Sequence, residues 1–123
     1  MKPWSSFGAL LFLMAFSLST LAADISGSWS ASFDTQIGKQ NYTYEFQVKG
    51  TALTGKIKSA NGESAVEDGT VEGDTVSFVE HMNYQGNTLK INYAGKIVSA
   101  DEIDFTRSVG EFATEQLVAR RLK

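Results

Sequence analysis

The chain contains no cysteine, one histidine (His81) and one proline (Pro3). Without cysteine it has no disulfide bond, no thiolate zinc site, no cysteine nucleophile and no lipid-modified N-terminal cysteine. A single histidine excludes a centre built from several histidines, so a zinc hydrolase is not expected. Basic residues are also few: 11 Lys and Arg against 14 Asp and Glu give a net charge of -3, and the short tail Arg120, Arg121 and Lys123 is the one basic cluster. The chain therefore lacks the positive surface that a nucleic-acid backbone requires.

The first 23 residues have the pattern of a cleaved signal peptide. Lys2 provides a positive start, residues 9–18 form an apolar run, and residues 20–23 end in small side chains. The apolar run is shorter than the roughly 20 residues that span a bilayer, so an uncleaved anchor is the lesser alternative. We expect cleavage after Ala22 or Ala23 and a periplasmic or secreted domain over residues 24–123, with no membrane span after cleavage.

Residues 24–123 show the period-two alternation of β-strands. Ile25, Trp29 and Phe33 fall on one face of the first segment, whereas serines occupy the other face. Glycines recur about every dozen residues, including at Gly86 and Gly95, as expected of short strands joined by tight turns. The same alternation predicts further strands around 41–49, 53–58, 65–71, 76–81, 89–93, 103–107 and 116–122.

About eight one-faced strands without a covering helix must hide their apolar sides against one another. The most economical solution closes the sheet on itself and leaves no exposed edge. We therefore predict an all-β fold, a single up-and-down antiparallel β-barrel. An open β-sandwich is the alternative, because alternation does not distinguish closure from stacking.

Two segments carry a resemblance to known barrel families. Residues 25–29 (ISGSW) resemble the Gly-x-Trp that opens the first strand of lipocalins and avidins, and residues 52–62 are similar to the second hairpin arm of bacterial avidins. The resemblance implies that Gly27 and Trp29 lie at the closed end of the barrel, where Arg120 or Arg121 packs across the Trp29 ring. The tryptophan-rich second half of the avidins is absent, so biotin binding is not implied. The chain also resembles small exported bacterial proteins that are loosely labelled as xylanase-like or glycoside hydrolases.

Two charged residues share the inward faces by parity. Glu80 follows Val76 and Phe78, and Arg107 follows Ile103 and Phe105, each at a predicted strand end. Buried charge is costly unless it is paired, so the two side chains should meet each other or reach the barrel mouth. One interpretation is a structural ion pair. The other makes them the polar anchors of a ligand pocket lined by Tyr42, Tyr44, Phe46, Phe78 and Tyr93.

Tyrosines and acids leave further alternatives open. Three of the four tyrosines point inward and can be core residues or a stacking platform for a ring or a sugar, while Tyr84 is expected in a turn over residues 82–87. Glu80 and Glu111 are the candidates for a glycosidase carboxylate pair, and Glu45 points outward. His81 is expected to be outward and alone. No serine-histidine-aspartate motif, phosphate loop or metal site is indicated, and no cofactor is expected.

Three functions remain. The first is an exported binding module that holds a small apolar or carbohydrate ligand at the barrel mouth. The second is a carbohydrate-active hydrolase with paired carboxylates, and the third is a structural or interaction domain without a pocket.

Overall fold

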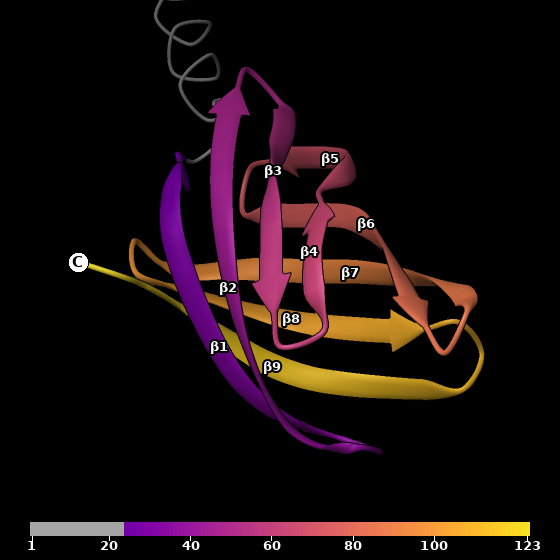
Figure 1. Cartoon of the computed structure of the whole chain (residues 1–123). Coiled ribbons are helices and arrows are strands. Elements are labelled where there is room, and N and C mark those ends of the chain that lie inside the picture. Colours follow the sequence, from indigo (N-terminus) through magenta and orange to yellow (C-terminus); the bar gives the residue numbers. More distant parts are fainter. Residues whose placement is uncertain (1–23) are drawn as a thin grey trace, which may run out of the picture.

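The computed structural model describes residues 24–123, and the predicted signal peptide, residues 1–23, lies outside the described residues. Nine strands follow one another along this part of the chain (Figure 1). Their bounds are β1 Gly27–Thr35, β2 Gly38–Lys49, β3 Ala52–Ser59, β4 Gly62–Ala65, β5 Glu67–Glu72, β6 Thr75–Tyr84, β7 Asn87–Ser99, β8 Glu102–Val109 and β9 Ala113–Arg121.

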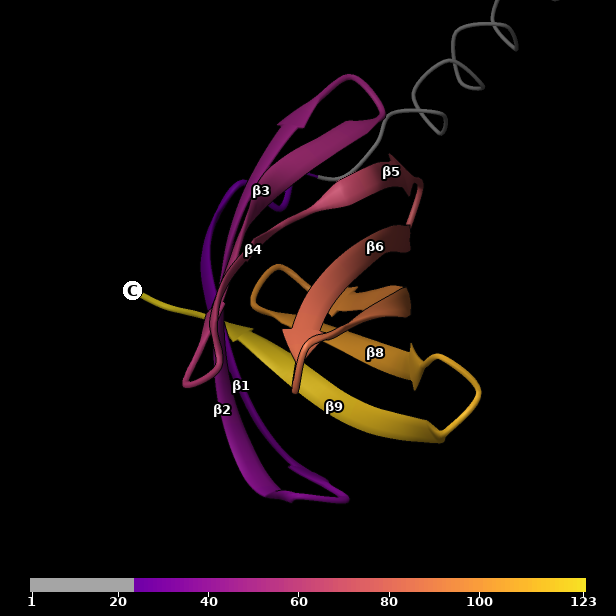
Figure 2. The same cartoon turned by 45° about the vertical axis from the view of Figure 1, so that its right-hand side comes forward.

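The strands form a closed antiparallel barrel of eight strands with one additional strand. Consecutive strands pair with each other from β5 to β9, β9 pairs with β1, and β1, β2 and β3 continue to β5. In Figure 1, β1 to β3 cross β6 to β9 steeply, and Figure 2 shows the sheet curving around its interior. The predicted up-and-down barrel is confirmed, and the sandwich alternative is wrong because β1 and β9 are hydrogen-bonded to each other.

The wall is irregular where the sequence predicted one weak strand around residues 65–71. β3 pairs with β4 over its second half and with β5 at its first residues. The pairing of β5 with β6 is interrupted by a bulge between Glu67 and Thr70, and Asp68 within it has a positive φ of 51°. A bulge bends its strand and increases the local twist. The predicted strand corresponds to β5, whereas the short strand β4 before it was not predicted, and the two strands meet at the buried Val66.

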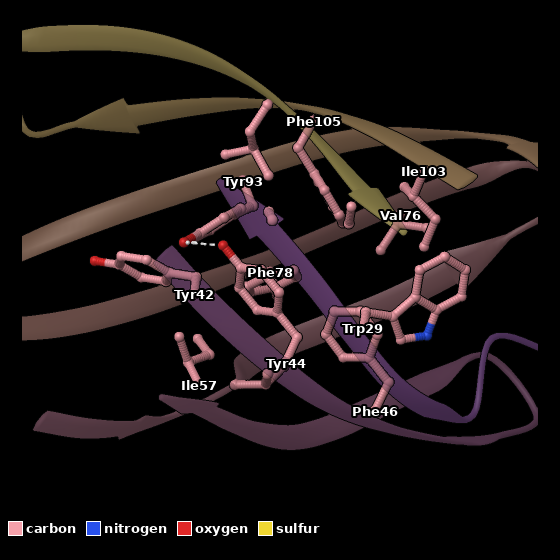
Figure 3. Close-up of a cluster of buried hydrophobic side chains, with 14 of the residues drawn as sticks. Trp29, Tyr42, Tyr44, Phe46, Ile57, Val76, Phe78, Tyr93, Ile103 and Phe105 are labelled. Atoms are coloured by element: carbon pink, nitrogen blue, oxygen red, sulfur yellow. Dashed lines mark hydrogen bonds between the residues drawn. The ribbon is translucent and has the colours of Figure 1, made fainter. Parts of the chain in front are cut away.

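Side chains alternate inward and outward along each strand, as the sequence predicted. On β1, Trp29, Ala31 and Phe33 are buried while Ser28 and Ser32 are exposed. On β8, Ile103, Phe105 and Arg107 are all buried. Figure 3 shows the aromatic cluster that results, with Trp29 and Tyr42 at its two ends. A one-residue slip in any of these strands would turn its core side chains to solvent, so the buried face fixes the register.

Gly95 does not end a strand, contrary to the sequence prediction. It lies inside β7, where a Cβ atom would approach the Phe105 ring to 2.5 Å. The glycine therefore makes room for a core ring. By contrast, Gln85 and Gly86 both have positive φ angles, 53° and 84°, and form the tight turn from β6 to β7. Tyr84 is the last residue of β6 rather than part of that turn.

One end of the barrel is closed by Trp29 and Arg121. The Arg121 guanidinium carbon lies 4.6 Å from the centroid of the Trp29 ring, and its Nη1 donates to the Ser26 carbonyl at 2.8 Å. A Cβ on Gly27 would lie 3.0 Å from the same nitrogen, so glycine leaves room for this contact. Of the two predicted cations, Arg121 covers the tryptophan, whereas Arg120 forms a surface ion pair with Glu102.

Candidate ligand-binding site

Glu80 and Arg107 meet inside the barrel, as their parity predicted. They lie on β6 and β8, on either side of β7, and are only 2% and 3% exposed. The Arg107 Nη2 and Glu80 Oε1 atoms are 3.7 Å apart. Arg107 lies near the end of its strand as expected, but Glu80 lies in the middle of β6, because this strand continues to Tyr84.

Tyr93 on β7 connects the two charged side chains. Its hydroxyl accepts a hydrogen bond from Arg107 Nε at 2.9 Å and donates one to Glu80 Oε1 at 3.0 Å. The Tyr44 hydroxyl lies 3.0 Å from the Tyr93 hydroxyl. The dashed line in Figure 3 marks this hydrogen bond. Because the single proton of Tyr93 is directed to Glu80, Tyr44 must be the donor in this bond. Every hydrogen-bonding position of the Tyr93 hydroxyl is therefore used.

Two further groups complete the surroundings of Arg107. Its Nη1 donates to Glu115 Oε1 at 2.6 Å, and its Nη2 donates to the Tyr42 hydroxyl at 2.8 Å. The guanidinium carbon also lies 5.3 Å from the ring centroid of Phe33 and 5.0 Å from that of Tyr42. In residues 24–123 no buried side-chain nitrogen or oxygen lacks a hydrogen-bond partner. The network is thus satisfied, which a polar cluster in a barrel core requires.

Burial sets the electrostatics of this network. It raises the pKa of Glu80 above its ordinary value, although Arg107 and the hydrogen bond from Tyr93 act in the opposite direction. It also raises the pKa values of Tyr44 and Tyr93, so both stay neutral. Burial alone disfavours the charge of Arg107, but Tyr93, Tyr42 and Glu115 outweigh it and raise the pKa of the guanidinium. The Arg107 cation therefore lies between the carboxyl groups of Glu80 and Glu115.

A pocket of about 310 Å³ opens above this network. Residues in or beside four hairpin turns surround it, those that join β1 to β2, β3 to β4, β6 to β7 and β8 to β9, which defines this end as the barrel mouth. Tyr42, Arg107 and Glu115 line its inner part. The apolar side chains of the lining are Ile37, Met82, Leu89, Val109, Phe112 and Ala113, and the amides are Gln36, Gln40, Asn61 and Asn87.

The rim of the mouth exposes apolar side chains. Phe112 is 71% exposed and Ile37 is 55% exposed, and both line the pocket. They come from the β8–β9 and β1–β2 turns, which touch through a bond from Gln36 Nε2 to the Phe112 carbonyl. Large apolar side chains that remain in water beside a pocket are typical of a binding surface.

A smaller cleft of about 90 Å³ reaches Glu80 from the side. It lies between β4 and the second half of β6, and its lining includes Ser64, His81 and Asn83. The Ser64 hydroxyl donates to Glu80 Oε2 at 3.2 Å. Glu80 therefore belongs to this polar cleft, whereas Arg107 and Glu115 belong to the mouth pocket.

The structure separates the predicted ligand-binding residues into two groups. Tyr42 and Arg107 line the mouth pocket. The others are buried below it: Phe78 stacks on Tyr93 with ring centroids 4.2 Å apart, and Tyr44 packs edge-on against both rings. These three aromatic side chains fill the core, which explains why the mouth pocket extends no deeper into the barrel.

The remaining acids and His81 lie on the outer surface. Glu111 is exposed in the β8–β9 turn and is not part of the pocket lining, and Glu45 forms an ion pair with Lys58 at 3.2 Å. His81 points outward as predicted but is not alone, because its Nδ1 lies 3.1 Å from Glu67 Oε2. No three acid or histidine side chains of residues 24–123 gather as metal ligands do.

Four residues of the site were not predicted from the sequence: Glu115, Met82, Leu89 and Val109. Glu115 has the same parity as Leu117 and Ala119, which are buried, and it pairs with Arg107 across β8 and β9. An inward assignment of Leu117 would have placed Glu115 inside the barrel. Met82 and Val109 continue the inward faces of Glu80 and Arg107, so the same parity was available for them.

Within residues 24–123 there is no helix that could cross a membrane. Comparisons with protein-family models, with curated proteins and with solved structures found no match to this chain.

Proposed function

We propose that this chain is an exported binding module that holds a small, mainly apolar ligand in the barrel mouth. The observation that carries the proposal is the pocket of about 310 Å³ with a wall of apolar side chains and a few polar groups at its inner end. Ligand sites in proteins have this composition and volumes from about 300 Å³ upward. The predicted signal peptide favours a function in the periplasm or outside the cell.

The inner end of the pocket is suited to orient a ligand. Arg107, Tyr42 and Glu115 are held by bonds to one another and by the aromatic core beneath them. Polar groups that are fixed before binding lose little conformational freedom when a ligand arrives. An apolar body between Leu89, Val109 and Phe112 would place a single polar group of the ligand against this end.

The rim also supports carbohydrate as a second ligand class. Gln40, Asn61 and Asn87 provide amides that can bond to hydroxyl groups, and Tyr84 and Phe112 provide aromatic faces. By contrast, no observation favours the hydrolase. Its first candidate, Glu80, contacts Arg107, Tyr93 and Ser64 below the pocket, and its second, Glu111, lies on the outer surface.

Binding of an uncharged fluorescent probe tests the proposal. N-phenyl-1-naphthylamine fluoresces in apolar surroundings, and we expect saturable binding at one site per chain. Ala113→Trp should abolish it, because Ala113 lines the pocket and an indole there would fill the mouth. Ala94→Trp is the matched control, since Ala94 is exposed in the middle of β7. A neutral oligosaccharide added as competitor tests the second ligand class.

Circular dichroism first establishes that both variants retain the barrel. Equal binding by the two folded tryptophan variants would contradict a mouth site. Absence of saturable binding to the native protein would favour the structural domain instead. If Ala113→Trp does not fold, Val109→Phe places a smaller ring in the same pocket.

A further inference from the structure

The charges around the mouth pocket constrain the polar group of its ligand. Of the residues that line it, only Arg107 and Glu115 are charged. Glu115 is bonded to Arg107, and Glu80 approaches the same guanidinium from below. A ligand that enters the mouth therefore meets a cation that already has carboxyl groups on two sides.

The hydrogen bonds of Arg107 constrain the polar group of the ligand further. A guanidinium has five N–H groups, and three of them are donated to Tyr93, Glu115 and Tyr42. The remaining N–H groups belong to Nη1 and Nη2, the nitrogens that are already closest to the two carboxyl groups. They can bond to an uncharged oxygen. An anion in this position would be removed from water and would lie next to Glu115 without a free countercharge.

We infer that the mouth pocket selects apolar molecules that end in a hydroxyl or an amine and rejects those that end in a carboxylate or another anion. This inference rests on the proposed function. A hydroxyl can accept from Arg107 and donate to Glu115, and an ammonium group can donate to Glu115. The polarity of the inner end thus determines the ligand class, although the wall itself accepts any apolar body of suitable size.

Three ligands with the same apolar body separate these chemistries. 1-Octanol, octylamine and octanoate are neutral, cationic and anionic at neutral pH, and each can be titrated against the bound N-phenyl-1-naphthylamine. We expect octanol and octylamine to displace the probe at concentrations at least about tenfold lower than octanoate. Octanoate that displaces the probe as well as the other two ligands would overturn the inference while leaving a mouth site intact.

Glu115→Gln tests whether the inner end causes the selection. This change leaves Arg107 without its nearest carboxylate, so octanoate should compete several-fold better than in the native protein, and octylamine should compete less well. Glu111→Gln is the matched control, because it removes the same charge from the exposed turn beside Phe112.

Equal effects of the two variants would indicate that overall charge, and not the inner end, sets the preference. That result would overturn the inference. If Glu115→Gln does not fold, the order in which the three ligands displace the probe from the native protein still tests the inference. Failure of the probe itself to bind the native protein would instead contradict the proposed function, so the two failures are distinguishable.

Discussion

At the scale of single residues, Arg107 is the residue that joins the buried polar network. One guanidinium bonds to Glu115, Tyr42 and Tyr93, and through Tyr93 it connects with Glu80. Loss of Arg107 would leave the carboxyl groups of Glu80 and Glu115 without a cation, and removing one member of a buried charged pair costs about 3 to 5 kcal/mol. Arg107, Tyr42 and Glu115 therefore belong both to this buried network and to the inner end of the pocket.

The raised pKa of Glu80 makes the stability of the barrel depend on pH. Because this pKa is higher in the folded state than the ordinary value of 4.5, the folded state binds the proton more tightly than the unfolded chain does. The resulting stabilisation is complete below that value and is lost as the pH rises through the folded-state pKa. Glutamine resembles the protonated acid and does not titrate. The free energy of unfolding of Glu80→Gln, relative to that of the native protein, should therefore rise with pH across this window, by about 1.4 kcal/mol for each pH unit that separates the two pKa values.

Urea unfolding at a series of pH values measures this difference. Glu111→Gln is the control for net charge, since its carboxylate lies on an exposed turn. The free energy of unfolding of Glu80→Gln minus that of the native protein should rise with pH. If this difference falls instead, the carboxylate is the form that the core favours, which would contradict the prediction.

Parity alone predicted the inward positions of Glu80 and Arg107, because each follows two apolar residues of the same face. It did not predict that Tyr93 connects them, since this contact depends on the pairing of β6, β7 and β8, which no single strand encodes. Glu115 was missed because the inward face of β9 was ambiguous in the sequence. Its neighbours Leu117 and Ala119 are buried, but the outward Val118 and the terminal Leu122 weaken the alternation.

At the scale of elements, the strands were predictable where one face is continuously apolar and less so elsewhere. β1, β2 and β8 follow their patterns, whereas the polar stretch after β3 became two short strands with a bulge. β7 was predicted too short, because Gly95 was taken as a turn residue. Its true role depends on Phe105, which comes from the neighbouring strand. Contacts between distant residues were thus the part that the sequence could not provide.

The closure between β1 and β9 provides a prediction at this scale. The two strands pair at Trp29 with Arg121 and at Ser30 with Arg120, and the Arg121 side chain adds bonds to the Ser26 and Ala100 carbonyls. Arg121→Ala removes these bonds and the contact with the Trp29 ring, so we expect a loss of about 1 to 3 kcal/mol in the free energy of unfolding. Urea denaturation followed by tryptophan fluorescence measures it.

Arg120→Ala is the matched control for this closure. Its guanidinium side chain is 67% exposed and pairs with Glu102, so its loss should cost no more than about 1 kcal/mol. Equal losses for the two variants would show that the backbone pairing alone stabilises the contact between β1 and β9, and that the Arg121 side chain over Trp29 adds nothing.

At the scale of the whole molecule, the barrel divides into a packed part and an open mouth. Aromatic side chains occupy the interior from Trp29 to Tyr42 (Figure 3). The pocket begins at Tyr42, which is part of its lining. An interior of eight strands is just wide enough for side chains or for one small ligand. This barrel has packed side chains at one depth and an open pocket at another. The sequence did not predict this division, because parity places a residue inside but gives no position along the barrel axis.

The buried tyrosines of the packed part make the barrel less stable at high pH. Burial raises the pKa values of Tyr42, Tyr44 and Tyr93, so these phenols release their protons more readily from the unfolded chain than from the barrel. The stability that they contribute is present below their ordinary value of 10.0 and is lost as the pH rises above it, by about 1.4 kcal/mol per tyrosine and pH unit. The rise in tyrosinate absorbance from these three residues should therefore coincide with the loss of the β-sheet circular dichroism signal. Tyr44→Phe should make the stability fall less steeply with pH, with Tyr84→Phe as the control for loss of a hydroxyl. Ionisation of all the tyrosines while the sheet signal is intact would contradict a closed aromatic core.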